Sequence, residues 1–138
     1  MDDRIRNLLQ IVGQEIMLYR DLTDHARKKT ALLLKGQTDA ILESNRIEDG
    51  FNSRLRNLEN ELGHLVQDLC RAFRIPREEF TLIRLADNVE QSLALEIRSR
   101  TVLFLNIIRQ LKSVSQRNIR LVEKTILRSL QTKISQRA

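Results

Sequence analysis

The fold is decided by residues 47–73, which read IEDGFNSRLRNLENELGHLVQDLCRAF. The large apolar residues of this stretch recur every three or four positions, a spacing that places them on one face of an α-helix. They are Ile47, Phe51, Leu55, Leu58, Leu62, Leu65, Leu69 and Phe73. Because this spacing is close to a heptad repeat, it predicts a long helix that packs lengthwise against other helices.

The preceding stretch, residues 2–35, shows the same spacing from Ile5 to Leu33. It predicts a first long helix, with Asp2 or Asp3 as its N-cap. Between the two stretches, Gly36 can adopt the left-handed conformation that ends a helix, and Thr38 or Asp39 can cap the next one. So short a turn between two long helices predicts an antiparallel hairpin.

A second break follows at Pro76, which disfavours helix at the residue before it and suits the start of a helix. It predicts a short helix over residues 77–85, and Asp87 or Asn88 is expected to cap a final helix. The predicted fold is therefore all-α: a single domain, residues 1–138, forming an antiparallel bundle of three long helices with one short helix before the last. The predicted helices span residues 2–35, 39–74, 77–85 and 88–135.

Composition agrees with long helices, since 41% of the 138 residues are hydrophobic, 4% are aromatic, and there are only four Gly and one Pro. The single cysteine, Cys70, excludes an intrachain disulfide and favours a reducing, cytoplasmic location. The chain does not start like a signal peptide, and its longest unbroken apolar stretches are four residues, at 31–34 and 102–105. No membrane span is expected.

The last predicted helix changes character along its length. Its first half continues the apolar spacing at Leu93, Ile97, Phe104, Ile108 and Leu111, and the positions that follow, Ser115 and Asn118, are polar. Beyond them Val122, Ile126, Leu130 and Ile134 recur every four residues, so the apolar stripe moves about 40° around the helix at each step. Such a stripe cannot keep facing the same neighbours. We therefore expect an amphipathic end that protrudes from the bundle and binds another partner.

Charge divides the chain at a similar place. Residues 97–138 hold ten Lys and Arg against Glu123 alone, a net charge of +9, whereas residues 1–96 hold 14 against 17, a net charge of −3. This asymmetry fits a solvated helix face that steers an acidic partner. No aromatic residue follows Phe104 and no helix-turn-helix or zinc pattern is present, so nucleic acid is not the expected partner. A basic helical adaptor or nucleic-acid-binding protein stays open as an alternative.

Catalytic and metal-binding motifs are weak. The string His25-Ala-Arg-Lys28-Lys29 resembles that of histidine phosphotransfer modules, but Lys29 stands where those modules have Gly. We expect His25 to be a surface residue, with a degenerate phosphotransfer module as the alternative. His64 and Cys70 have no further ligand at metal-binding spacing. The sequence therefore predicts no catalytic residue, no metal, no cofactor and no enzymatic activity.

Several segments together resemble the FlgN family of flagellar export chaperones. They are Glu15-x-x-x-Tyr19-x-x-Leu22, the hairpin ALLLKGQTDAI at residues 31–41, Leu55-x-x-Leu58-Glu59, and Asn118-x-x-Leu121-Val122. Two positions depart from the family pattern, because Lys28 stands where an acidic residue is common and Glu48 where a basic one is.

The resemblance implies a cytosolic chaperone that binds the C-terminal helical segments of hook-filament junction proteins, prevents their premature assembly, and works with the flagellar export apparatus. In that family the C-terminal amphipathic helix holds the client, which here places client binding on Ile119, Val122, Ile126, Leu127, Leu130 and Ile134. The charges that would steer the client are Arg120, Lys124, Arg128 and Lys133. A homodimer in which two terminal helices cover each other stays open.

Overall fold

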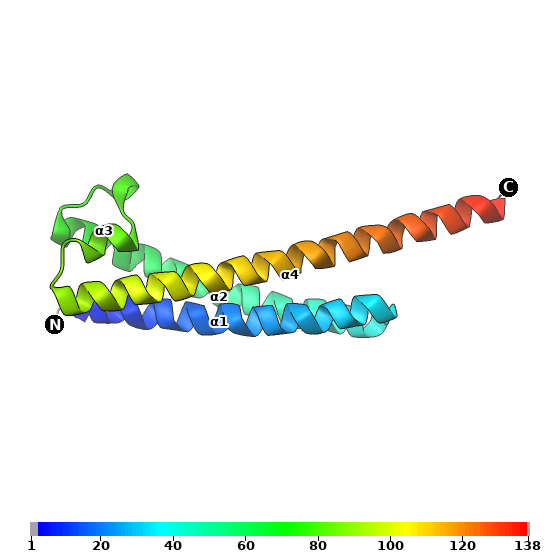
Figure 1. The fold of residues 1–138 in the computed structure, drawn as a ribbon, viewed down its shortest axis with the longest axis horizontal. Helices are drawn as coiled ribbons and strands as arrows, with labels where there is room; N and C mark the ends of the chain where they lie inside the picture. The colour runs from blue at the N-terminus through cyan, green and yellow to red at the C-terminus, as the bar shows by residue number, and fades with distance from the viewer. Residues whose placement is uncertain (1–2, 138) are drawn as a thin grey trace.

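The computed structural model describes residues 3–137 and confirms the all-α class. Its four α-helices are α1 (Asp3–Lys35), α2 (Thr38–Phe73), α3 (Leu82–Ala86) and α4 (Gln91–Arg137). Figure 1 shows three long helices lying lengthwise, with α3 at the end of the bundle where the chain begins. Asp2, where the first helix was predicted to begin, lies outside the described residues.

The first turn has the conformation predicted for it. Gly36 adopts a left-handed backbone with φ of 66°. Its N–H donates to the carbonyl of Leu33, and the N–H of Gln37 donates to the carbonyl of Leu32, both at 3.3 Å. This pair of bonds is the Schellman motif, which satisfies carbonyls left over at the end of α1.

The prediction that Thr38 or Asp39 caps α2 was wrong. The N-cap is Gln37, which makes no side-chain capping hydrogen bond, and Thr38 and Asp39 already lie in the first helical turn. The turn is so short that the helix starts before either residue can serve as the cap. In the first turn, the negative charge of Asp39 still interacts favourably with the positive end of the helix dipole.

The predicted helix over residues 77–85 is also wrong, because the structure divides it in two. A 3₁₀ turn, η1 (Arg77–Glu79), is followed by Phe80 in extended conformation and then by α3. Thr81 is extended as well, and its hydroxyl oxygen accepts a hydrogen bond from the Arg84 N–H at 3.0 Å. Thr81 is thus an N-cap, and a helix cannot run through its own cap residue.

The last helix begins at Gln91 rather than at residue 88, and neither Asp87 nor Asn88 caps it. The side-chain amide of Asn88 donates to the carbonyl of Arg84 at 2.8 Å and so closes the end of α3. Asp87 forms an ion pair with Arg98 at 2.8 Å. Both side chains thus make bonds other than capping bonds to α4, and α4 starts only after the short connection that contains them.

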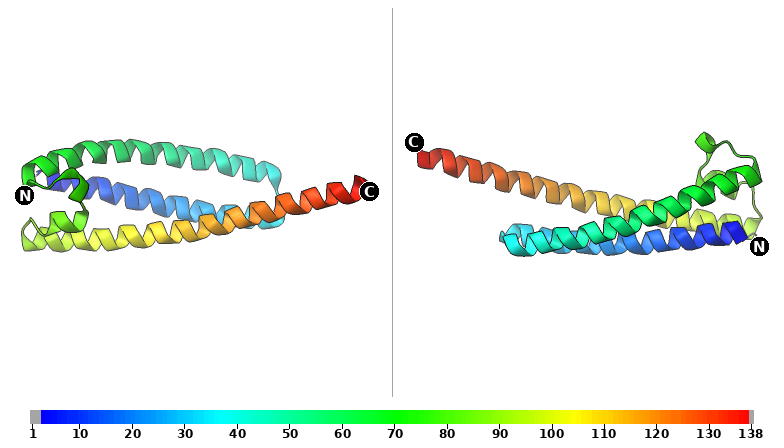
Figure 2. Two further views of the ribbon diagram at one scale, coloured as in Figure 1. Left: turned by 90° about the horizontal axis from the view of Figure 1, so that it is seen from above. Right: turned by 180° about the vertical axis from the view of Figure 1, so that it is seen from behind.

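Helix α1 is the centre of the bundle, because both α2 and α4 pack along it while α2 and α4 barely touch each other. Figure 2 shows α2 and α4 on either side of α1, with α3 between them at one end. Contacts between α1 and α4 join residues about the same number of positions apart: Arg100 donates to the Leu9 carbonyl, 91 residues away, and Asn118 to the Ala26 carbonyl, 92 residues away. The constant offset means that α4 runs parallel to α1, whereas α2 runs antiparallel.

The core is concentrated at the end of the bundle where α3 lies. The main cluster of buried side chains comprises Ile5, Leu8, Leu9, Val12, Ile16, Leu69, Leu85, Ala86, Leu93, Ala94 and Ile97. A smaller cluster around Leu18, Leu22 and Leu55 lies farther along α1. Toward the α1–α2 turn the core ends, and Ile47, which was predicted to belong to the packed face of α2, is 44% exposed.

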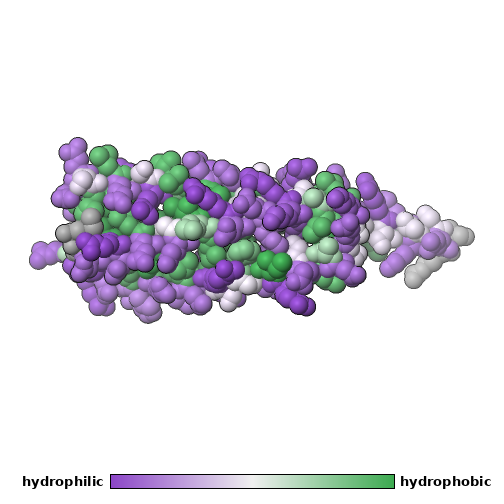
Figure 3. Space-filling view, turned by 90° about the horizontal axis from the view of Figure 1, so that it is seen from below, coloured by the Kyte–Doolittle hydropathy of each residue, from purple (hydrophilic) through white to green (hydrophobic). Residues whose placement is uncertain are grey.

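Outside the core, hydrophilic side chains dominate the surface with smaller hydrophobic patches between them, as the face in Figure 3 shows. Within residues 3–137, none of the helices combines the length and the apolar character needed to cross a membrane.

Candidate protein-binding surface

The end of α4 extends past the rest of the bundle. Given the offset of 91 residues between α1 and α4, the end of α1 at Lys35 is level with about residue 126 of α4. The last ten or so residues of α4, roughly 15 Å of helix at 1.5 Å per residue, have no part of α1 beside them. Figure 1 shows this end, coloured orange to red, diverging from the α1–α2 hairpin.

The six side chains predicted to bind a client lie between residues 119 and 134 of α4, partly beside the end of α1 and partly beyond it, and are 38% to 68% exposed. We call them the terminal face: Ile119, Val122, Ile126, Leu127, Leu130 and Ile134. No other part of α4 exposes so many large apolar side chains in so few residues. The structure therefore places the predicted residues together on one exposed segment.

Helix geometry separates the terminal face from the side of α4 that contacts α1. Measured at about 100° per residue from the buried Asn118, the terminal face falls in an arc from roughly 40° to 180°. Arg120, Lys124 and Arg128 fall in the neighbouring arc, from roughly 200° to 280°, and Lys133 falls among the apolar residues. All four cations are exposed. Glu123 also falls among the apolar residues, at about 140°, so the terminal face is an apolar stripe that contains Lys133 and Glu123 and has a basic border on one side.

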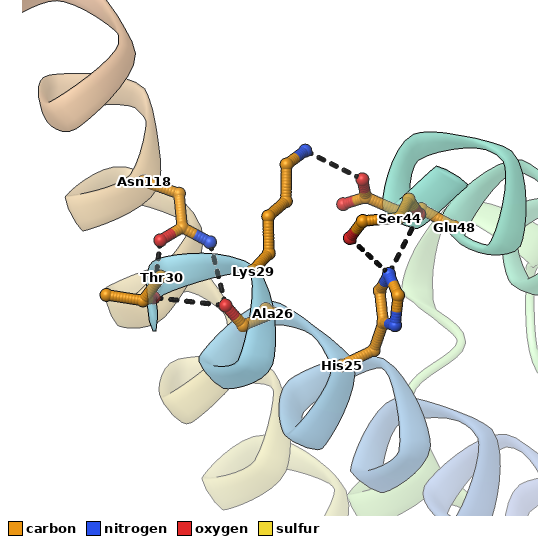
Figure 4. A network of polar contacts seen from close by, with 7 residues as sticks. All are labelled: His25, Ala26, Lys29, Thr30, Ser44, Glu48 and Asn118. Atoms are coloured by element: carbon orange, nitrogen blue, oxygen red, sulfur yellow. Dashed lines mark hydrogen bonds and ion pairs between the residues drawn. The ribbon is translucent and has the colours of Figure 1, made fainter. Parts of the chain in front are cut away.

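Asn118 holds α4 to α1 immediately before the terminal face. Its side-chain amide donates to the carbonyl of Ala26 at 2.9 Å, and its side-chain oxygen accepts a hydrogen bond from the hydroxyl of Thr30 (Figure 4). Asn118 is 7% exposed. The polar residue in the apolar spacing of α4 therefore does not weaken the contact between the helices, because Asn118 makes specific buried bonds instead of facing water.

Beyond Asn118 the side of α4 that would continue along α1 is polar, with Thr125, Ser129 and Thr132 in the corresponding positions. The hydroxyls of Thr125 and Thr132 each donate to the carbonyl four residues earlier, at 2.9 Å. Hydroxyls satisfied within their own helix offer α1 neither apolar surface nor hydrogen bonds. This composition explains why α4 leaves the bundle after Asn118.

A hollow of about 300 Å³ lies where α4 leaves the hairpin. Lys29 and Glu48 on one side of it form an ion pair at 3.0 Å that joins α1 to α2 (Figure 4). Ile119 and Val122 line the other side, together with Asn118. The terminal face therefore begins inside a concave surface and continues outward along an uncovered helix.

His25 is not the surface residue that was expected. It lies half-buried between α1 and α2, where its Nε2 is 2.8 Å from the carbonyl oxygen of Ser44 and 2.9 Å from the Ser44 hydroxyl (Figure 4). A carbonyl can only accept, so Nε2 carries the proton and donates it. The imidazole also lies 6.0 Å from the ring of Phe51. His25 thus serves the contact between two helices.

Glu15 is the buried group whose importance the sequence patterns did not reveal. It is 3% exposed, and within residues 3–137 its Oε1 has no hydrogen-bond partner. Burial raises the pKa of its carboxyl to about 7, and the negative charge of Glu59 adds to the effect. One pattern could have found it, because Glu15 occupies an apolar-stripe position of the first helix, three residues after Val12 and four before Tyr19.

The remaining candidates give no site. His64 is exposed and Cys70 is buried. Across the described part of the chain, no three His, Cys, Asp or Glu side chains lie close enough together to hold a metal ion.

Comparison of the chain with protein-family models, with curated proteins and with solved structures gave no match. The fold and the terminal face define an all-helical protein with a one-sided apolar extension.

Proposed function

We propose that the protein is a flagellar export chaperone that binds the C-terminal helical segments of hook-filament junction proteins in the cytosol, keeps them unassembled and passes them to the export apparatus. The observation that carries this proposal is the terminal face, six large apolar side chains 38% to 68% exposed on a helix that outruns its bundle. The sequence resemblance to the FlgN family gives the class of client. Binding, not chemistry, is the activity proposed.

The terminal face is large enough to hold a client helix. Fully burying a Leu, Ile or Val side chain contributes roughly 1.5 to 3 kcal/mol, and the six residues are about half exposed to begin with. Their joint burial thus supplies on the order of 5 to 9 kcal/mol before ordering and association costs are subtracted. The client must add its own apolar surface to reach micromolar affinity, which requires about 8 kcal/mol net.

The charges beside the terminal face indicate which kind of partner is complementary to it. Arg120, Lys124 and Arg128 border the apolar stripe, so an amphipathic client helix with acidic residues along one flank is complementary to it. A second copy of this chain fits less well, because it would bring a basic border against a basic border. Charge complementarity therefore favours a different protein over a homodimer.

The test is the double variant Ile126→Asp with Leu130→Asp, which places two charges in the middle of the terminal face. Binding of a purified C-terminal segment from a hook-filament junction protein, measured by isothermal titration calorimetry, should weaken at least 100-fold. The reason is that two apolar contacts are lost and two carboxylates would have to be desolvated.

The matched control is Leu95→Asp with Val102→Asp, which introduces the same charges at apolar residues of α4 that are 59% and 58% exposed but flank the bundle. This control should bind like the unmodified protein. All proteins should keep their helical content and unfolding midpoint, since the four side chains are exposed. Equal affinity of the terminal-face variant and the control would refute the proposal, and a concentration-dependent dimer in sedimentation would favour self-association.

A further inference from the structure

A cavity lies at the opposite end of the bundle from the terminal face, in the wedge that α2 and α4 leave between them. Its volume is about 320 Å³. We call it the Glu15 cavity, and its walls are mostly apolar: Val12, Leu62, Val66, Phe80, Leu82 and Phe104. An apolar cavity of roughly 150 Å³ already admits a benzene ring, so this one has room for a small ligand or a long side chain.

The charged groups of the cavity are two carboxylates and one guanidinium, and its other polar side chain is Thr81, whose hydroxyl already accepts a hydrogen bond from the Arg84 N–H. Glu15 comes from α1, Glu59 from α2 and Arg77 from η1, and neither α3 nor α4 contributes a charged group to the lining. Among the described residues, the Oε1 atom of Glu15 has no hydrogen-bond partner. Arg77 is exposed, so water screens its charge, whereas Glu15 is 3% exposed and its carboxyl is screened less.

An unpartnered acceptor in an apolar cavity calls for a ligand with a donor at one end and an apolar body. Leaving a buried polar group without a partner costs free energy that a ligand's hydrogen bond would recover. A positively charged donor suits this site better than a neutral one, because Glu59 adds a second negative charge near Glu15. The rings of Phe80 and Phe104 in the walls offer π faces that attract cations.

The residues around Glu15 also favour a positively charged ligand. Tyr19 lies one helical turn after it, and the pKa of its phenol is raised by burial and by the charges of Glu59 and Glu15. The Tyr19 ring packs edge-on against Phe104 at 5.7 Å between centroids. Tyr19 does not itself line the cavity, but its ring packs against Phe104, which does.

The α2 wall of the cavity is open at Gly63. Within the described residues, a Cβ built on Gly63 would meet no atom within 4 Å apart from its chain neighbours and the nearby backbone of α2, so there is open space beside the glycine. The same is true of Gly50, which lies in α2 away from the cavity. These two glycines form a matched pair for a blocking experiment.

We propose that the Glu15 cavity binds an aliphatic chain that ends in a primary ammonium group, with the ammonium against Glu15 and Glu59 and the chain along the apolar walls. Such a chain is found both in a lysine side chain of a partner protein and in a free alkylamine. The site is independent of the terminal face, so the two proposals stand or fall separately.

The probe is pentylammonium chloride, titrated into the isotope-labelled protein and followed by two-dimensional NMR. Pentylammonium should shift the amide signals of residues around the cavity and bind at least tenfold more tightly than 1-pentanol. Glu15→Gln should weaken the binding of pentylammonium at least tenfold. Gly63→Phe, which fills the cavity, should abolish binding, and Gly50→Phe should not.

The pH dependence adds a readout that a purely structural role of Glu15 would not give. With a pKa of about 7, Glu15 is mostly protonated at pH 6 and mostly ionised at pH 8. Pentylammonium should therefore bind roughly tenfold more tightly at pH 8 than at pH 6 in the unmodified protein. In Glu15→Gln this dependence should disappear.

Two results would overturn the proposal: equal affinity for pentylammonium and 1-pentanol, or unchanged binding in Gly63→Phe. If Gly63→Phe fails to fold, Glu15→Gln and the comparison with pentanol still decide. Nα-acetyl-lysine methylamide distinguishes the two sources of the ligand. Binding comparable to that of pentylammonium indicates a lysine side chain of a partner, and binding of pentylammonium alone indicates a small amine.

Discussion

Replacing Glu15 by glutamine should change how the stability of the protein depends on pH. In the folded protein the pKa of Glu15 is raised from 4.5 to about 7, with desolvation as the main cause and Glu59 as the second. The folded state thus holds this proton more tightly than the unfolded chain does. It follows that the free energy of unfolding falls as the pH rises from about 4.5 to about 7 and stays lowered above it.

The size of the effect follows from the shift. A pKa difference of this size corresponds to roughly 3 kcal/mol between the two protonation states, of which roughly 2 kcal/mol is lost between pH 5 and pH 8. The Glu15→Gln variant has no titratable group at this position, so it should lose none of this stability between pH 5 and pH 8. Urea unfolding of both proteins at pH 5 and pH 8, followed by circular dichroism, measures the difference between their two pH effects directly.

Two further variants test the cause. Glu59→Gln removes the second contribution and should reduce the pH effect without abolishing it, whereas Glu61→Gln, which removes an exposed carboxylate of α2, should leave it unchanged. Stability that changes with pH to the same extent in Glu15→Gln and in the unmodified protein would show that Glu15 is hydrated in solution.

Three other substitutions test separate features of the fold. Asn118→Ala should lower the free energy of unfolding by about 1 to 3 kcal/mol in urea titrations, since it removes the buried bonds to Ala26 and Thr30; a loss below 0.5 kcal/mol would mean that water replaces them. Arg74→Gly should raise the thermal unfolding midpoint by a few degrees, because Arg74 has a φ of 54°, and an unchanged or lower midpoint would contradict this. Arg98→Ala should change stability by less than about 1 kcal/mol, since its ion pair with Asp87 is exposed, and a larger loss would point to a packing role.

The long helices and the hairpin were predictable from the sequence because their causes are local. Apolar residues three or four apart define a helical face whatever lies opposite, and Gly36 takes a left-handed conformation that its lack of a Cβ permits. The apolar stripe of the terminal face follows in the same way, because the drift of Val122, Ile126, Leu130 and Ile134 around the helix is a property of spacing alone.

The details between the helices were not predictable in this way. The division of residues 77–85 depends on Thr81 capping α3, and the late start of α4 depends on bonds that Asp87 and Asn88 make elsewhere. Several residues compete for each capping role, and the sequence does not rank geometries that differ by about 1 kcal/mol.

Sequence by itself determined the helical class, the hairpin and the apolar stripe of the last segment, all of which arise from residues within a few positions of each other. Tertiary structure alone decided that Asn118 is buried against Thr30, 88 residues away, that His25 faces Ser44, and that the Glu15 Oε1 has no hydrogen-bond partner within residues 3–137. The physical reason is that burial and hydrogen bonding of a polar side chain depend on which helix lies opposite it and at what height. Helical periodicity determines on which face of its helix a residue lies, but it gives no information about the neighbouring helix.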